Sequence, residues 1–64
     1  MVRVALIGYG YWGPNLARNL HQLPQSVFAA CCDLDAGRLA KVAALYPGVR
    51  TTTRLEDIWQ DPDI

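Results

Sequence analysis

The chain is short, electrically neutral and moderately apolar. Its 64 residues are enough for one small domain, six Lys+Arg balance six Asp+Glu, and 52% of the residues are hydrophobic while 19% are charged. A neutral chain lacks both the phosphate neutralisation of nucleic-acid binding and the polybasic attraction to anionic membranes. No apolar run approaches the ~18 residues of a membrane span, and the first residues do not form a secretion signal. We therefore expect a cytoplasmic protein without nucleic-acid or membrane partners.

Two apolar runs predict strands that are buried on both faces of a parallel sheet. The first covers Val2 to Ile7 and the second covers Val27 to Cys32. A shorter third strand is expected from Val49 to Thr52. Cys31 and Cys32 are neighbours in the second run, and side chains alternate between the faces of a strand, so we expect two small buried residues without a disulfide.

Helical periodicity predicts a first helix from Pro14 to about Gln22 and a second from about Ala36 to Tyr46. Asp35 is a suitable N-cap for the second helix. The apolar residues expected to face the sheet are Leu16, Ala17, Leu20 and Leu23 in the first helix, and Leu39, Val42, Ala43 and Tyr46 in the second.

A capping box, Thr53-Arg54-Leu55-Glu56, predicts a short third helix that buries Leu55, Ile58 and Trp59. His21 has no partner at metal-ligand spacing, so no metal site is expected. The titratable residues expected to be solvent-exposed rather than functional are His21, Arg50 and Arg54.

A glycine motif follows the first strand without a gap and opens the first helix. It reads Gly8-Tyr9-Gly10-Tyr11-Trp12-Gly13, and Asp33 closes the next strand 20 positions after Gly13 (33 − 13). This combination is typical of a dinucleotide-binding βαβ unit. Gly8 allows the sharp turn, Gly10 lets the backbone approach a pyrophosphate at the helix N-terminus, and Gly13 allows close helix–strand packing.

Asp33 is expected to accept hydrogen bonds from the adenosine ribose, and its charge favours NAD over NADP. In the alternative interpretation, the glycines only serve packing and Asp33 is a solvated carboxylate at the end of a strand. A flavin site shares the loop pattern and stays open as a further alternative. Methyltransferase loops tend toward G-x-G-x-G, whereas Trp12 stands at the corresponding position here.

The run from Gly8 to Leu20 resembles the Gfo/Idh/MocA family of oxidoreductases, and in particular members that oxidise sugars or sugar nucleotides. The resemblance continues through Cys32-Asp33-Leu34-Asp35 and Tyr46-Pro47-Gly48-Val49. It extends through Leu55-Glu56-Asp57-Ile58 to Asp61-Pro62-Asp63-Ile64, and so covers nearly the whole chain.

The resemblance implies hydride transfer between a nicotinamide cofactor and a sugar, sugar-nucleotide or polyol. It implies that Tyr9, Tyr11 and Trp12 lie along the pyrophosphate and that Leu34 and Arg38 flank the adenine. Because an arginine at this edge can meet a 2′-phosphate, Arg38 keeps NADP possible. A non-catalytic nucleotide-sensing module on the same fold is the alternative function.

The expected fold class is therefore α/β, a Rossmann-type βαβαβ parallel half-sheet. Residues 1–64 are expected to form the N-terminal portion of a dinucleotide-binding domain, truncated before a fourth strand. The substrate domain and the catalytic residues are expected outside this chain, in a homo-oligomeric full-length protein. Without the fourth strand, Val2–Ile7 is expected to be an exposed apolar edge, so that the isolated fragment is poorly stable or self-associating.

Overall fold

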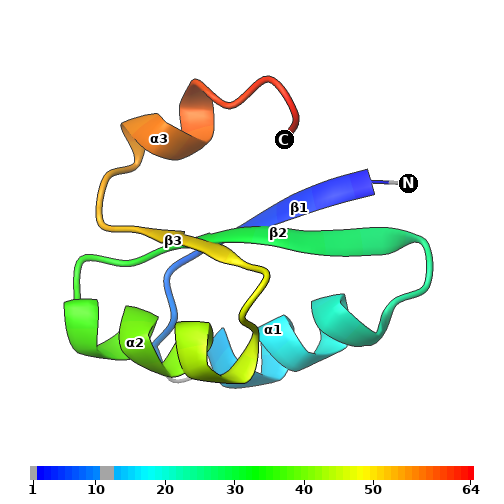
Figure 1. The fold of residues 1–64 in the computed structure, drawn as a ribbon, viewed down its shortest axis with the longest axis horizontal. Helices are drawn as coiled ribbons and strands as arrows, with labels where there is room; N and C mark the ends of the chain where they lie inside the picture. Colours follow the sequence, from blue (N-terminus) through cyan, green and yellow to red (C-terminus); the bar gives the residue numbers. More distant parts are fainter. Residues whose placement is uncertain (1, 11–12) are drawn as a thin grey trace.

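The computed structural model describes residues 2–10 and 13–64, and in these residues three parallel strands alternate with three helices (Figure 1). The α/β class and the βαβαβ order are thereby confirmed. No helix in the described part of the chain has the length and apolar character that a membrane crossing needs. The elements in chain order are β1 (Val2–Ile7), α1 (Gly13–Gln22), β2 (Ser26–Cys32), α2 (Ala36–Leu45), β3 (Arg50–Thr52) and α3 (Glu56–Trp59).

The sheet has the order β1-β2-β3, with parallel pairing between neighbours and one register shift between Val4 and Ala5. The pairing continues past the strand ends, because Gly8 N donates to Cys32 O at 2.7 Å and Asp33 N donates to Thr52 O at 3.1 Å. These bonds align the carboxyl ends of the three strands. The segments that follow them therefore meet at one edge of the sheet.

The two faces of the sheet are covered unequally. Figure 1 shows α1 and α2 on one face and the short α3 on the other. Cys31 belongs to the core under α1 and α2, whereas Cys32 packs with Ile58 of α3, so the prediction that the two thiols point to opposite faces is confirmed. Both are free and buried. The buried residues of the larger core are Tyr9, Ala17, Phe28, Cys31, Leu39, Val42 and Val49.

Burial of β1 on both faces is wrong, because no residue of this strand is buried: Val4, Ala5 and Leu6 are half-buried and the others are exposed. Val2 is 64% exposed and Ile7 is 54% exposed, because β1 is an outer strand that pairs only with β2 within the described residues. The prediction of an exposed apolar edge is confirmed instead.

The helices bury narrower faces than their periodicity predicts. In α1 only Gly13 and Ala17 are buried, Leu16 is exposed, and Leu23 is exposed because it lies beyond the last helical residue. In α2, Asp35 is the N-cap as predicted, and its carboxylate accepts from the N–H groups of Gly37 and Arg38. Ala43 is exposed because it is turned about 100° from buried Val42.

The capping box is also wrong. The hydroxyl of Thr52, not Thr53, accepts from Arg54 N at 3.0 Å and donates to the carboxylate of Asp57. The helix starts at Glu56 without a side-chain cap. Since a four-residue helix covers the sheet with one side only, Ile58 is buried while Leu55 and Trp59 are exposed.

Candidate functional site

A groove lies where the three strands end. It has a volume of about 740 Å³, which is within the range of small-molecule sites. Parallel α/β sheets bind ligands outside the carboxyl ends of their strands, so this groove is where a ligand is expected. Its lining includes Ile7, Gly8, Asp33, Leu34, Arg38 and Leu55.

The glycines of the motif play two different parts. Gly8 has a φ of +92°, in the left-handed region that favours glycine, and a Cβ at this position would meet no atom of residues 2–10 or 13–64 within 4 Å. Among the described residues, the atom that a Cβ on Gly10 would meet is Nη1 of Arg38, at 3.8 Å. A Cβ on Gly13 would lie 3.1 Å from the ring of Tyr9. Gly8 therefore leaves the backbone open to the groove, Gly10 lies beside Arg38, and Gly13 allows close packing at the start of α1.

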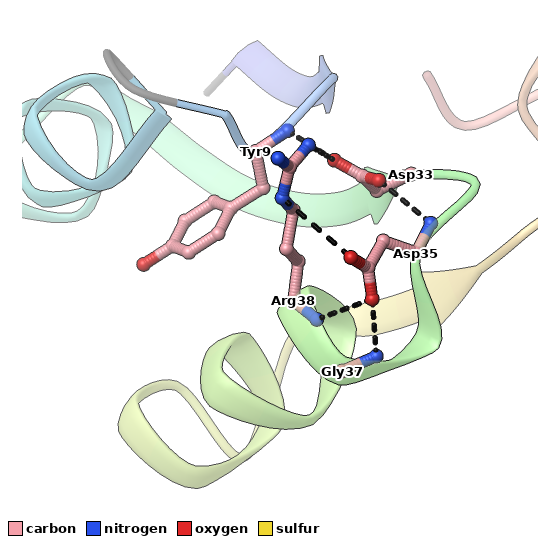
Figure 2. Close-up of polar contacts among 5 residues, drawn as sticks. All are labelled: Tyr9, Asp33, Asp35, Gly37 and Arg38. Atoms are coloured by element: carbon pink, nitrogen blue, oxygen red, sulfur yellow. Dashed lines mark hydrogen bonds and ion pairs between the residues drawn. The ribbon is translucent and has the colours of Figure 1, made fainter.

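Tyr9 contributes to the site through its backbone. Its side chain is buried in the core and points away from the carboxylates, as Figure 2 shows. Its N–H donates to Oδ2 of Asp33 at 2.6 Å. Tyr11 and Trp12, the other two loop residues predicted to lie along the pyrophosphate, fall outside the described residues.

Asp33 is buried, at 8% exposure, between two turns of the chain. Oδ1 accepts from Asp35 N at 2.8 Å, while Oδ2 accepts from Tyr9 N. These two hydrogen bonds hold the pKa of the Asp33 carboxyl below its usual value, against the effect of burial, and the nearby Arg38 lowers this pKa further. Asp33 is therefore ionised at neutral pH, and it ties the turn after β1 to the turn after β2.

The carboxylate of Asp33 has acceptor capacity left. Two carboxylate oxygens offer about four lone-pair positions, and the two backbone N–H groups use one on each oxygen. The hydroxyl groups of a sugar in the groove are suitable donors for the remaining positions. Asp33 thus fits a ribose while it holds the two turns together.

Arg38 and Leu34, which the resemblance places beside the adenine, both line the groove. Leu34 is 92% exposed, so its side chain offers an apolar surface to a ligand. Nη1 of Arg38 lies 3.8 Å from Oδ2 of Asp33, and Nε lies 3.9 Å from Oδ2 of Asp35 (Figure 2). The groove therefore carries two carboxylates and one guanidinium.

Sequence reasoning missed part of this arrangement. The bond from Tyr9 N to Asp33 joins residues 24 apart in the chain, and no local pattern predicts it. The groove is also lined by Thr53 and Leu55, for which the sequence predicts only a helix cap and a buried helix face. Their position directly after the third strand is the signal that places them at this edge.

The thiol of Cys32 borders the groove, but its chemistry is that of a packed side chain. Burial raises the pKa of both thiols, and that of Cys31 reaches about 11. Both are therefore protonated at neutral pH, and a thiol is a weak nucleophile compared with its thiolate.

No protein-family model matches the chain, and no curated protein matches it. The function proposed below therefore rests on the geometry of the groove and on the residues of the glycine motif.

Proposed function

We propose that the chain is the NAD(P)-binding segment of an oxidoreductase that transfers a hydride between a nicotinamide cofactor and a sugar, sugar-nucleotide or polyol. The observation that carries the proposal is the placement of ionised Asp33 beside the open turn of Gly8 and Gly10, at the carboxyl edge of a parallel sheet. The oxidoreductase chemistry and the substrate class rest on the resemblance of the motif residues.

The residues at the groove fit the adenosine half of a dinucleotide. The open space above Gly8 leaves room for phosphate oxygens next to the backbone, and at Gly10 the nearest described atom to a Cβ would be Nη1 of Arg38, at 3.8 Å. The first turn of a helix leaves N–H groups without intrahelical partners, and the positive end of its dipole attracts anions. Asp33 would hold the ribose hydroxyls, and exposed Leu34 would contact the base.

The part played by this chain is binding and orientation. When bound, the nicotinamide ring supplies the hydride chemistry. The backbone of the Gly8–Gly10 turn and the carboxylate of Asp33 would hold the adenosine and phosphate portion in place. We assign no proton-transfer role to the described residues.

Calorimetric titration of the purified protein with NAD, NADP, FAD and S-adenosylmethionine tests the proposal. We expect the nicotinamide dinucleotides to bind and the other two cofactors not to bind. Asp33→Asn should weaken NAD binding by about tenfold or more, because hydrogen bonds to charged groups contribute ~1.5–3 kcal/mol.

Asp35→Asn is the matched control. It removes a carboxylate in the same turn, but asparagine keeps the helix cap, so NAD affinity should change by less than about twofold. Thermal melting of both variants reports whether they are folded. Equal loss of affinity in the two folded variants, or preferential binding of FAD or S-adenosylmethionine, would contradict the proposal.

A further inference from the structure

Two buried residues of the described chain, Asp33 and Thr52, have hydrophilic side chains, and both lie at the carboxyl edge of the sheet. Asp33 is the residue that would hold a ribose, and Thr52, the last residue of β3, is 9% exposed. Asp33 N donates to Thr52 O at 3.1 Å, so the two residues are joined directly. A buried hydroxyl is retained where it has partners, and those of the Thr52 hydroxyl belong to the segment after β3.

The Thr52 hydroxyl holds the turn that follows β3. It accepts from Arg54 N at 3.0 Å and donates to Oδ2 of Asp57, which lies in α3. A hydroxyl can donate once and accept at the same time, and a hydrogen bond to a carboxylate is stronger than one to a neutral group. The turn is therefore fixed at Arg54 and again at Asp57, on both sides of Leu55.

This turn forms one wall of the groove. In the strand order β1-β2-β3, the segment after β2 lies between the other two, so the turn after β1 borders the groove on one side and the turn after β3 borders it on the other. Thr53 and Leu55 of the turn after β3 line the groove. Leu55 is 36% exposed, so part of its side chain is accessible to a ligand. The shape of this wall therefore depends on the turn that Thr52 and Asp57 hold.

We propose that Thr52 is a positioning residue of the groove: its hydroxyl, bonded to Asp57, holds Leu55 where the leucine side chain contacts the ligand. This inference rests on the proposed function and adds Leu55 to it as a binding residue on the β3 side. Without the hydroxyl the turn has more conformations, and ligand affinity falls with the fraction of molecules in which the wall is formed. A ligand that reaches only the Gly8 turn and Asp33 is unaffected.

Thr52→Val is the decisive variant, because valine keeps the branched shape and the backbone carbonyl of threonine and removes the hydroxyl. NMR titrations with AMP and with ribose 5-phosphate compare a ligand that has a base with one that has none. We expect AMP affinity to fall by about tenfold and ribose 5-phosphate affinity to change by less than about twofold. Thr52→Ser keeps the hydroxyl and should restore most of the AMP affinity.

Thr51→Val is the matched control. It makes the same substitution one position earlier in β3, where the side chain points to the other face of the sheet, and it should leave both affinities unchanged. Asp57→Ala removes the same hydrogen bond from its other end and should lower AMP affinity as much as Thr52→Val does. Since both variants remove one interaction, the double variant should bind AMP no more weakly than either single variant.

The outcomes separate this inference from the proposed function. If the wild-type protein binds NAD and AMP, but Thr52→Val and Asp57→Ala leave the ratio of AMP to ribose 5-phosphate affinity unchanged, the role of Thr52 is refuted and the proposed function stands. If the wild-type protein binds neither NAD nor AMP, both are refuted. Melting temperatures establish which variants are folded. If Thr52→Val does not fold, Asp57→Ala, at a partly buried residue, decides by the same ratio.

Discussion

At the amino end of the sheet, aromatic side chains contact one another beside a second groove of about 400 Å³, whereas open backbone and ionised groups border the carboxyl end. At the amino end the rings of His21 and Tyr46 lie 4.9 Å apart, and Phe28 meets Tyr46 edge-on at 5.5 Å. At the carboxyl end, Asp33 is the one buried charged residue among those that the structure describes. Aromatic contacts stabilise a fold, while a buried carboxylate is retained where it has specific partners. We therefore expect the amino end of the sheet to contribute mainly to stability and the carboxyl end to contribute mainly to ligand binding.

The largest expected effect is a loss of stability from a substitution at the amino end of the sheet. Phe28→Ala removes a buried ring from the main core and should lower the free energy of unfolding by about 3 kcal/mol. Urea denaturation measures the loss. If the two ends are separate, the NAD affinity of the folded fraction stays within about twofold of wild type, and a tenfold loss would show that the ends are coupled.

Alanine substitutions of Gly8 and Gly48 compare the two ends of the sheet directly. Gly8→Ala should cost about 1–2 kcal/mol, because a side chain at a φ of +92° is strained even though space is available. Gly48 lies at the amino end with equally open space and outside the left-handed region, so Gly48→Ala should be neutral or slightly stabilising. Similar melting temperatures for the two variants would contradict this assignment.

The free energy of unfolding should depend on pH through the carboxyl group of Asp33, at the carboxyl end of the sheet. The Asp33 pKa is lower in the folded protein than in the unfolded chain, so Asp33 binds its proton more weakly when folded. Its contribution to stability is therefore complete above the unfolded pKa of about 3.9 and is lost as pH falls through the folded value. Urea midpoints between pH 6 and pH 3 should fall more steeply for wild type than for Asp33→Asn, and parallel curves would contradict the assigned shift.

The smallest effect is expected on the outer surface. Arg50→Gln removes an exposed ion pair and should change the free energy of unfolding by less than about 0.5 kcal/mol. Urea denaturation again measures the change. A loss above 1 kcal/mol would show that the pair with Asp61 holds the segment after α3.

The order of elements was predictable because strands and helices differ in the period of their apolar residues. The observed bounds of β2 and α2 lie within one residue of those expected, and Asp35 caps α2 because its short carboxylate reaches the first free N–H groups. Burial was less predictable. Leu16 and Trp59 have apolar side chains at plausible positions, yet each helix touches the sheet along a narrow line that only the packing defines.

The candidate site was predictable where it depends on local geometry and unpredictable where it depends on contacts between turns. The spacing of Gly8, Gly10 and Asp33 indicates the edge at which they meet, because the carboxyl ends of parallel strands align. The bond from Tyr9 N to Asp33 and the position of Arg38 across the groove depend on the sheet register and on side-chain rotamers. A short sequence motif predicts neither the sheet register nor the side-chain rotamers.

The most direct test of the central claim is a crystal structure of the intact protein soaked with NAD. We expect the pyrophosphate against the backbone of the Gly8–Gly10 turn and a hydroxyl of the adenosine ribose within hydrogen-bond distance of the Asp33 carboxylate. A dinucleotide bound elsewhere, with the groove at the carboxyl ends of the strands left without ligand, would contradict the account.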